Sequence, residues 1–426
     1  MRKIVVVGSG AGGSTLAKEL ASRGHDVTVL ERGRYHRLGS EMEAMKFYPR
    51  SGWRLTPGEV SEGDVELLRT LMAGGSTMVT LANALRALED ELRSVGLNLE
   101  EEFAEAEEEM GVKPMPEEMM GERTVLLMHA SERLGYDVKP MPKSVDFTRC
   151  SSCGMCVTGC AYGAKWTAQN YLAEARKSGA RIVLNSEVRR VIHSGGMVRG
   201  LEVRGPSGSY ELETDLVVLA AGGLGTPRIL LRSGIEAGQG LFADLFVNTY
   251  GIVEGVSWGE EMGMATLIDE FAQEGFILSP ILDTKMHMLL YLPMLKKGLA
   301  FKRDRLLGIM TKIRDESSGR VFEDGVRKPV TVEDRRRIEK GVEVSREILI
   351  EAGARESSIY TTRVRGAHLG GTAPIGGVVN RDLETEIEGL FVGDASAFPS
   401  SPGEPPVLTI VALAKRLSRL VGEMAG

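Results

Sequence analysis

The spacing between apolar residues changes several times within the N-terminal stretch of the chain. Residues 4–7 are an apolar, β-branched run, which is typical of a buried parallel strand. From Ser14 to Arg23 two leucines lie one helical turn apart with alanines beside them, so this segment is predicted to be a helix. A second strand is predicted from Asp26 to Leu30. A glycine-rich turn separates the first strand from the helix, and the whole forms a βαβ unit.

The same pattern predicts further elements along the chain. Turn residues and apolar runs alternate between residues 240 and 295, which predicts an antiparallel sheet, with Met286 to Met294 as a buried strand. A helix is predicted to start at Thr226-Pro227, because proline suits the first helical turn. The remaining predicted strands are 181–184, 188–192, 198–204, 210–213, 215–223 and 391–394, and the remaining helices are 99–110, 123–134, 331–353 and 406–420.

Composition places the chain among ordinary globular proteins. It has 426 residues with 42% hydrophobic and 26% charged content, enough for two domains with a sizeable core. The net charge of −7 argues against a general affinity for nucleic acid. We see no signal peptide and no apolar run near the ~18 residues that a membrane-spanning helix needs. We therefore expect a cytoplasmic protein without a transmembrane segment, and an oligomer is compatible with the sequence.

The turn after the first strand contains the pattern G-x-G-x-x-G, at Gly8, Gly10 and Gly13, with Gly12 beside it. Gly8 permits the tight turn, Gly10 lets the backbone approach a pyrophosphate, and Gly13 lets helix and strand pack closely. The helix N-terminus attracts phosphate. Glu31 and Arg32 follow the second strand, where an acidic side chain can accept hydrogen bonds from a ribose. The unit therefore predicts dinucleotide binding.

A second glycine-rich stretch lies within Met72 to Val79. Gly74, Gly75 and Ser76 stand in an apolar frame, which suggests backbone held close to a ligand. A simple helix-capping turn is the alternative.

All four cysteines of the chain lie in one short stretch, as Cys150, Cys153, Cys156 and Cys160. The spacing C-x2-C-x2-C-x3-C is that of bacterial ferredoxins without the trailing proline, so a [4Fe–4S] cluster is predicted. Because no second cysteine set exists, either Cys160 completes the cluster or the fourth iron has another ligand. Zinc and a metal-free set of thiols are the alternatives, although zinc sites usually separate their cysteine pairs further.

The combination resembles the glucose–methanol–choline (GMC) flavoprotein oxidoreductases. The resemblance rests on motifs spread along the chain: Gly8 to Gly13 with Glu31, Gly74 to Thr77, Val217 to Gly234 including Gly222, His368 to Thr372, Gly393-Asp394-Ala-Ser396 and Leu408 to Ala414. It covers the cofactor-binding segments well and residues 240–360 poorly. Many relatives also carry a segment like Gly159 to Lys165, so Cys160 fits the family whether or not iron is present.

The resemblance implies FAD as cofactor, and it implies roles for particular residues. Glu31 would bind the adenosine ribose, the Val188 backbone would lie near adenine, and Asp394 would lie on the ribityl side. The closing helix, which begins at Pro406 and Val407, would direct its N-terminus at the flavin pyrimidine edge. A helix N-terminus there would stabilise the anionic reduced flavin.

The family's reaction takes a hydride from a CH–OH carbon to flavin N5, and the resemblance makes His368 the residue that receives or holds the hydroxyl proton. A second histidine or asparagine usually precedes the proline of the closing helix. Pro405 occupies that position here. Glu404 could replace the missing partner, so we take His368 and Glu404 as the candidate catalytic residues.

The predicted fold class is α/β, α+β overall, with a Rossmann-like FAD-binding domain and a discontinuous, mainly antiparallel substrate domain. The predicted FAD-binding segments are 1–89, 170–238 and 362–426, the substrate or cap segments 90–140 and 239–361, and the four-cysteine insertion 141–169.

The favoured function is a dehydrogenase for a small-molecule substrate, with the cluster passing single electrons to a carrier such as a ferredoxin. An electron-transfer component with a structural His368 is one alternative. A reductase of a polarised double bond or carbonyl is the other.

Overall fold

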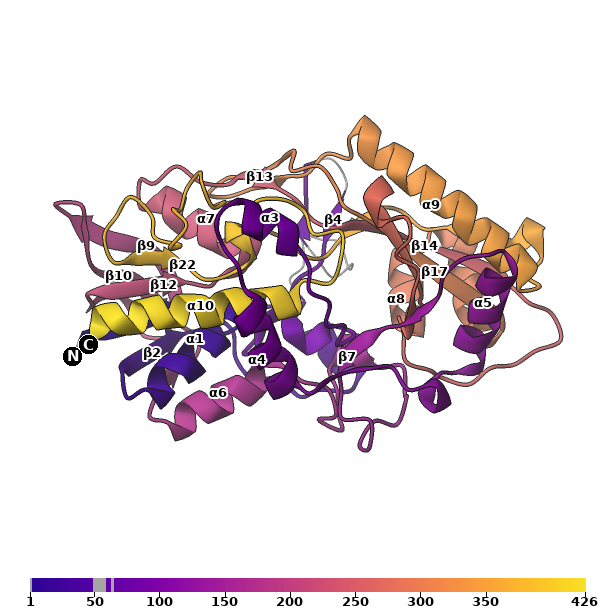
Figure 1. The fold of residues 1–426 in the computed structure, drawn as a ribbon, viewed down its shortest axis with the longest axis horizontal. Helices are drawn as coiled ribbons and strands as arrows, with labels where there is room; N and C mark the ends of the chain where they lie inside the picture. The colour runs from indigo at the N-terminus through magenta and orange to yellow at the C-terminus, as the bar shows by residue number, and fades with distance from the viewer. Residues whose placement is uncertain (1, 49–58, 63–64) are drawn as a thin grey trace.

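The chain folds into two lobes, which are seen side by side in the computed structural model (Figure 1). The structure describes residues 2–48, 59–62 and 65–426. The first lobe holds both chain ends together with helices α1 and α10. The second lobe holds helices α5 and α9 (Figure 1). The lobes correspond to two separate hydrophobic cores.

The first lobe is built on a five-stranded sheet in the order β22-β12-β1-β2-β8, in which every pairing is parallel. Its strands are β1 (Lys3–Val7), β2 (Asp26–Leu30), β8 (Arg181–Val183), β12 (Leu216–Leu219) and β22 (Leu390–Val392). All five were predicted. The centre of the sheet is wholly apolar, with Val6 opposite Val218, because a parallel strand is buried on both faces.

Helices cover this sheet. α1 packs against α6 and α10, and α10 packs against α4. Their bounds are α1 (Ala11–Ser22), α4 (Glu100–Met110), α6 (Ala168–Lys177), α7 (Gly222–Arg232) and α10 (Val407–Ala425). The sequence placed the starts of two helices too late. Helix α1 begins at Ala11 and not at Ser14, since the Ser14 N–H already bonds to the Gly10 carbonyl at 2.9 Å. Helix α7 begins at Gly222, so that Pro227 lies inside it. Residues 92–110, which the sequence assigns to the cap, belong to this core.

The second lobe contains a seven-stranded, mainly antiparallel sheet in the order β16-β17-β14-β21-β4-β3, with β20 also paired to β14. Its strands are β3 (Glu59–Val60), β4 (Glu66–Leu67), β14 (Leu245–Ile252), β16 (Phe276–Pro280), β17 (Leu306–Ile313), β20 (Tyr360–Thr361) and β21 (Arg365–Gly366). Helix α9 (Val332–Glu351) packs on β17 and β14, and α5 (Glu122–Arg133) packs on α9. The predicted antiparallel sheet and both helices are confirmed.

The predicted strand from Met286 to Met294 is wrong. The chain there forms helix α8 (Lys285–Tyr291) and the 3₁₀ segment η5 (Met294–Arg305). Thr284 caps α8, because its side chain accepts a hydrogen bond from His287 N. Met288 and Leu292 are buried four residues apart, which is helical spacing that a continuous apolar run hides.

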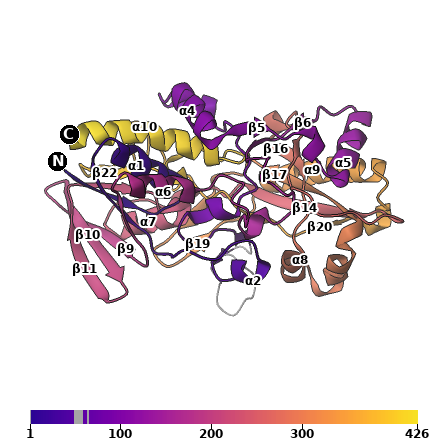
Figure 2. The ribbon, with the colours of Figure 1, turned by 90° about the horizontal axis from the view of Figure 1, so that it is seen from below.

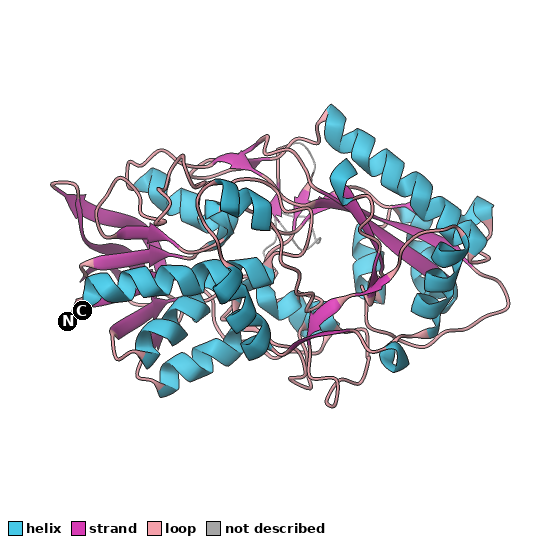
Figure 3. Ribbon diagram, in the orientation of Figure 1, coloured by secondary structure: helices cyan, strands magenta, loops and turns pink. Residues whose placement is uncertain are grey.

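The remaining elements are short, apart from a three-stranded hairpin sheet of β9, β10 and β11 that matches its prediction (Figure 3). They are α2 (Glu41–Ala44), α3 (Glu89–Ser94), β5 (Val112–Pro114), β6 (Lys139–Pro140), β7 (Pro142–Ser144), β9 (Glu187–Ser194), β10 (Met197–Gly205), β11 (Gly208–Glu213), β13 (Gln239–Leu241), β15 (Thr266–Leu267), β18 (Gly319–Val321) and β19 (Val326–Arg327). The 3₁₀ turns are η1 (Gly75–Val79), η2 (Glu117–Met119), η3 (Cys156–Thr158), η4 (Ala272–Glu274), η6 (Glu356–Ser358) and η7 (Ala395–Ala397).

The fold class is therefore as predicted, a mixed α/β protein with a Rossmann-like lobe and a sheet-rich second lobe. No helix in the described part of the chain is long and apolar enough to cross a membrane.

Candidate active site

A cavity of about 660 Å³ lies at the carboxyl ends of the parallel strands β1, β2, β12 and β22. In open α/β sheets this is the edge at which ligands bind. Most of the residues predicted from the sequence line it: Gly8, Gly10, Gly12, Glu31, Arg32, Gly75, Ser76, Val188, Gly222, His368, Asp394, Pro406 and Val407. Gly13, Gly74, Gly393 and Glu404 do not line it.

The glycines around the first turn allow backbone segments to touch. Gly8 has φ +101°, and a Cβ there would overlap the Ala220 carbonyl. A Cβ on Gly13 would overlap the Gly8 carbonyl, so Gly13 supports the turn from behind, as predicted. A Cβ on Gly12 would overlap the carbonyl of Gly393. A Cβ on Gly10, in contrast, would have no protein atom within 4 Å, so the space beside this residue is open to a ligand.

Glu31 is held in place by the turn that it faces. Its Oε2 accepts hydrogen bonds from Ser9 N at 3.0 Å and Ser9 Oγ at 2.7 Å, and its Oε1 accepts one from Gly33 N at 2.6 Å. Ser9 Oγ in turn accepts a bond from Gly74 N at 3.1 Å. Ser9 was not singled out in the sequence, although it stands within the glycine motif. It links the two glycine-rich stretches.

Asp394 is braced in a similar way. Its Oδ2 accepts hydrogen bonds from Gly222 N at 2.8 Å and Thr226 Oγ1 at 2.6 Å, and its Oδ1 accepts one from Ser396 N at 2.7 Å. Asp394 therefore fixes the start of α7 to the end of β22 while it lines the cavity. The first turn of α10 reaches the same cavity through Pro406 and Val407. Its first N–H groups have no partners within the helix.

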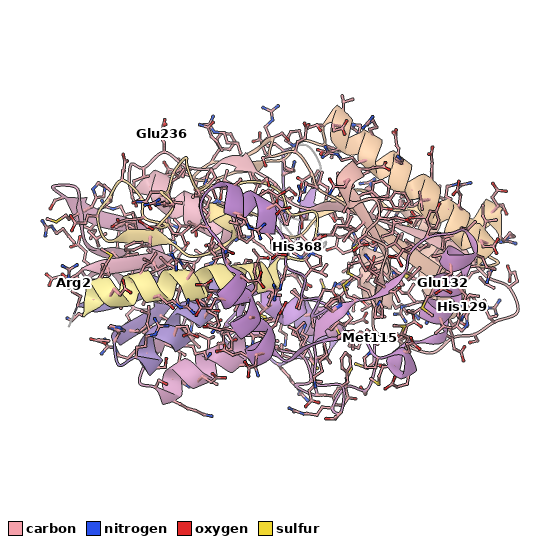
Figure 4. The ribbon with its side chains drawn as sticks, in the orientation of Figure 1. Arg2, Met115, His129, Glu132, Glu236 and His368 are labelled. Carbon is pink, nitrogen blue, oxygen red and sulfur yellow. The ribbon has the colours of Figure 1, made fainter. Side chains whose placement is uncertain are left out.

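One wall of the cavity carries an imidazole between the two lobes: Figure 4 shows His368 near the middle of the molecule, whereas His129 lies far out on the second lobe. His368 Nδ1 is 2.9 Å from Asp244 Oδ2 and 2.8 Å from Lys312 Nζ. Lys312 Nζ is also 2.9 Å from Asp244 Oδ2, so the three atoms form a closed triangle. With Nδ1 engaged, Nε2 is the ring nitrogen left for a molecule in the cavity.

Buried charges continue behind this triangle. Asp244 Oδ1 accepts hydrogen bonds from Ser401 Oγ at 2.8 Å and Gly403 N at 3.0 Å. Ser401 Oγ also contacts Asp315 Oδ1 at 2.8 Å, and Lys328 Nζ is 2.8 Å from Asp315 Oδ2. Both lysine–aspartate pairs are buried, so each charge is balanced by its neighbour.

The charges around His368 affect its protonation. Burial lowers the pKa of His368, the Lys312 ammonium lowers the pKa further, and the Asp244 carboxylate opposes both. The imidazole is therefore neutral at neutral pH and able to accept a proton. Lys312 and Asp244 were not predicted from the sequence. Lys312 had one available signal, since it is a lysine inside the apolar strand Leu306–Ile313.

Sequence comparison settles the family to which this site belongs. The profile of the GMC oxidoreductase family matches residues 3–248 and again residues 325–414. The chain is a GMC oxidoreductase. An FAD-dependent enzyme is thus established at the level of the family.

Alignments with similar proteins extend over almost the whole length of this GMC oxidoreductase. An uncharacterized protein of Methanocaldococcus jannaschii is 30% identical over 98% of this chain and 99% of its own length. A long-chain-alcohol oxidase of Arabidopsis thaliana is 26% identical over 97% of this chain and 66% of its own. The crystal structure of pyridoxine 4-oxidase from Mesorbium loti has the same fold, with a TM-score of 0.73, 19% identity and 99% coverage of both chains.

Glu404, the second predicted catalytic residue, lies beside the buried charges but not in the cavity wall of this GMC oxidoreductase. Burial raises the pKa of Glu404 to about 7, with Arg314 opposing the rise and the Asp244 carboxylate adding to it. The preceding residue, Gly403, donates its N–H to Asp244. Glu404 therefore lies close enough to the Asp244–Lys312 pair for both charges to act on its pKa.

The four cysteines lie in a loop outside the cavity, and all four are free thiols. Cys150, Cys156 and Cys160 pack against one small apolar cluster, and Ala164 N–H points at Cys160 Sγ at 3.3 Å. Burial is the main reason that the pKa of the Cys150 thiol is raised, and each of the other three thiols raises it further. Within the described residues, no group of three or more His, Cys, Asp or Glu side chains is arranged to hold a metal ion.

Two buried lysines lie beneath the cysteine loop. Lys143 Nζ donates to Leu81 O at 3.0 Å, Asn83 Oδ1 at 2.7 Å and Gly263 O at 3.1 Å. Lys165 Nζ donates to Met78 O at 2.9 Å, Thr80 O at 2.6 Å and Cys156 O at 2.9 Å. Thr80 lines the cavity, and Lys165 donates both to Thr80 O and to Cys156 O, so Lys165 joins the cavity wall to the cysteine loop.

Proposed function

We propose that this GMC oxidoreductase transfers a hydride between a CH–OH carbon and FAD, and that His368 handles the hydroxyl proton. The carrying observation is the position of His368 in the cavity wall, with Nδ1 engaged and Nε2 available. Oxidation of the alcohol releases one hydride and one proton. FAD supplies the hydride acceptor, and the neutral His368 Nε2 receives the proton.

The residues of the cavity fit an FAD molecule. The open space at Gly10 and the N-termini of α1 and α10 suit an anionic pyrophosphate and a reduced flavin. Thr70 Oγ1 lies in the wall, buried and without a hydrogen-bond partner among the described residues, which is typical of a group that binds a ligand. We assign Glu31 to the ribose, Val188 to the adenine end and Asp394 to the ribityl chain.

We assign Asp244 and Lys312, which form the triangle with His368, a positioning role. Asp244 can accept the Nδ1–H of His368, and this tautomer leaves the Nε2 lone pair toward the cavity. Lys312 then donates to Asp244 Oδ2 and not to Nδ1. When Nε2 takes a proton, the imidazolium is stabilised by the Asp244 carboxylate. Lys312 keeps the buried site neutral before the transfer, because its ammonium balances Asp244.

We further propose that the cysteines bind one [4Fe–4S] cluster, which passes electrons singly to a carrier such as a ferredoxin. Four thiols at ferredoxin spacing and an N–H directed at Cys160 Sγ support it. The buried ammonium groups of Lys143 and Lys165 would balance an anionic cluster. Cluster thiolates bind four separate irons, so their arrangement differs from that of ligands around one ion. Reduced thiols also fit the cytoplasm.

A second candidate function is a plain alcohol oxidase, in which dioxygen takes the electrons and the thiols bind no metal. It is favoured by the names of the relatives, which include long-chain-alcohol oxidases and a cholesterol oxidase. The two functions differ in what reoxidises the reduced enzyme.

Reoxidation kinetics separate the two functions without knowledge of the substrate. The holoenzyme is reduced anaerobically with light and a sacrificial donor, and is then mixed with dioxygen or with oxidised ferredoxin. A dehydrogenase reoxidises with ferredoxin much faster than with dioxygen. The opposite order would contradict the electron-carrier proposal and support the oxidase. A panel of primary alcohols, from methanol to 1-dodecanol, then tests the CH–OH class by anaerobic bleaching of the flavin.

A further inference from the structure

The helical excursion of α8 and η5, between strands β16 and β17, exposes large apolar side chains. Met294, Leu295 and Phe301 are 78%, 96% and 68% exposed. The side of the same excursion that faces the protein is apolar too, since Met288, Leu292 and Ala300 belong to a buried cluster beneath it. A helical segment on the surface of a globular protein normally presents a polar outer face, so apolar groups on both sides indicate a contact with something else.

The charge of this excursion is opposite to that of the whole molecule. The chain has a net charge of −7, yet Asp304 is the single acidic residue between positions 285 and 305. The basic residues of that segment are Lys285, Lys296, Lys297, Lys302, Arg303 and Arg305. Arg303 is used internally, since it donates to Asp283 O and pairs with Glu260. Lys285, Lys296, Lys302 and Arg305 are exposed.

Helix α2 extends the same surface. Met286 N donates to Glu41 Oε1 at 3.0 Å, and the rings of Tyr48 and His287 are 6.2 Å apart, so α2 and α8 are neighbours. Figure 2 shows both at the lower edge of the molecule. Met42 on α2 is 68% exposed. We call the following set the basic apolar surface: Met42, Lys285, Met294, Leu295, Lys296, Phe301 and Lys302.

We propose that the basic apolar surface docks this protein onto an anionic lipid membrane. The apolar side chains would enter the boundary between headgroups and acyl chains, and the lysines would contact lipid phosphates. Lys285 Nζ already lies 4.7 Å from the centre of the Phe301 ring, which places a cation beside an apolar group, as such a boundary requires. The contact is peripheral, because no described helix can cross a membrane.

A second copy of the chain fits this surface less well. A two-fold contact brings a surface against itself, and here that would set lysines against lysines. An acidic protein would satisfy the lysines, but it would have to bury a Leu295 side chain that stands almost fully exposed. The docking proposal does not depend on the redox reaction, so either can fail alone.

The test is sedimentation of the holoenzyme with vesicles. One vesicle type is half phosphatidylglycerol and half phosphatidylcholine, and the other is phosphatidylcholine alone. We expect binding to the anionic vesicles at low salt, little binding to the neutral ones, and release at high salt. Since each surface lysine contributes about fivefold in affinity, Lys296→Glu with Lys302→Glu should weaken binding at least about 25-fold. Leu295→Ser with Phe301→Ser should weaken it about tenfold or more.

Matched controls lie on α9. Val332 is 86% exposed and Arg335 is also exposed, so Val332→Ser with Arg335→Glu changes the same chemistry elsewhere. This control should bind vesicles like the wild type. Absence of binding to anionic vesicles would overturn the proposal, as would an equal loss in the control. Concentration-dependent dimers that disappear in Leu295→Ser with Phe301→Ser would assign the surface to self-association. Binding of ferredoxin without vesicle binding would assign it to an acidic protein.

Discussion

Two of the regions in which lysines are buried differ in what balances the lysine charge. Beside the cavity, Lys312 pairs with Asp244 at 2.9 Å and Lys328 with Asp315 at 2.8 Å. Beneath the cysteine loop, the hydrogen bonds of Lys143 and Lys165 all go to uncharged oxygens. Burial lowers the pKa of Lys143 to about 7 and that of Lys165 to about 8, and neighbouring thiols oppose the change.

Under the proposed function, the region beside the cavity balances its own charges, whereas a cluster would complete the region under the cysteine loop. Placing an ammonium group in a protein interior is costly unless an anion accompanies it. Near His368 the protein supplies that anion itself. Near the cysteines the described residues supply no carboxylate to these lysines, and the negative charge would come from thiolates bound to the proposed iron–sulfur cluster. The comparison is in line with the proposed roles, in which the protein balances the charges beside His368 and a cluster would balance those under the cysteine loop.

The largest effect is expected at His368. His368→Ala should retain FAD but slow flavin reduction by the best alcohol of the panel ~10²–10⁴-fold, the usual size of a general-base contribution. Anaerobic stopped-flow absorbance measures this rate. His129→Ala is the matched control, because His129 is a surface residue that contacts Glu132. A wild-type rate in His368→Ala would remove the histidine from the proton transfer.

The pH dependence of the same rate tests the triad. His368 accepts a proton when it is neutral, so the rate should rise with pH through a pKa below the ordinary 6.5 and then level off. The Lys312 ammonium holds that pKa down. Lys312→Met should therefore move the rising limb to higher pH. An unchanged limb would mean that Lys312 does not act on His368.

Asp244→Asn should lower the free energy of unfolding. It leaves the buried Lys312 without its carboxylate, and loss of one partner of a buried pair costs about 3–5 kcal/mol. Denaturant unfolding of the holoenzyme measures the change. Asp137→Asn is a control, since the Asp137 side chain is mostly exposed and its contact with Lys139 is a surface ion pair at 3.6 Å. A loss no larger than the control's would mean that Asp244 and Lys312 do not form an ionised pair.

Glu404→Gln tests the edge of the same charge network. The folded state raises the pKa of Glu404 from 4.5 to about 7, so the folded protein favours the neutral acid. This stabilising contribution is complete below pH 4.5 and is lost as pH rises to about 7. The variant should therefore be more stable than the wild type above pH 7, by about 3 kcal/mol, and similar at pH 4.5. Parallel stability curves would contradict this.

The smallest effect on stability is expected at Lys143. In iron-free protein, Lys143→Met removes an unbalanced buried charge but also three hydrogen bonds, so the unfolding free energy should change by only about 1 kcal/mol. In cluster-loaded protein the same change should weaken iron retention and make the cluster harder to reduce. A large destabilisation of the iron-free protein, similar to that of Asp244→Asn, would erase the contrast between the two regions.

The two regions were also unequally predictable from the sequence. The strand–glycine turn–helix unit is local, so Gly8, Gly10 and Glu31 could be placed from their spacing. The cluster of Asp244, Lys312 and His368 is not local, because Lys312 comes from strand β17 and the other two residues from separate loops. A lone lysine in an apolar strand does not reveal its partners. His368 itself was found through its motif. Glu404 was placed in the catalytic pair, whereas it lies outside the cavity wall.

The strand predicted at 286–294 is wrong for a physical reason. In a short run of apolar residues, periodicity does not distinguish a buried strand from a buried helix. The helix-capping residue Thr284 was the local signal that favoured the helix. The predicted starts of α1 and α7 were late because glycines, which are poor helix formers, occupy the first turn of both helices. Tertiary contacts determine where these helices begin, and the local sequence pattern does not contain that information.

The central claim is that the cysteine loop is completed by an anionic cluster. The direct measurement is the iron and acid-labile sulfide content per FAD of anaerobically purified protein, read together with its visible spectrum. We expect about four irons and four sulfides per flavin, with a broad shoulder beside the flavin bands. Cys153→Ser should lose both while keeping FAD, and Ser151→Ala should keep everything. Flavin bands alone, without iron or sulfide in the wild-type protein, would contradict the account.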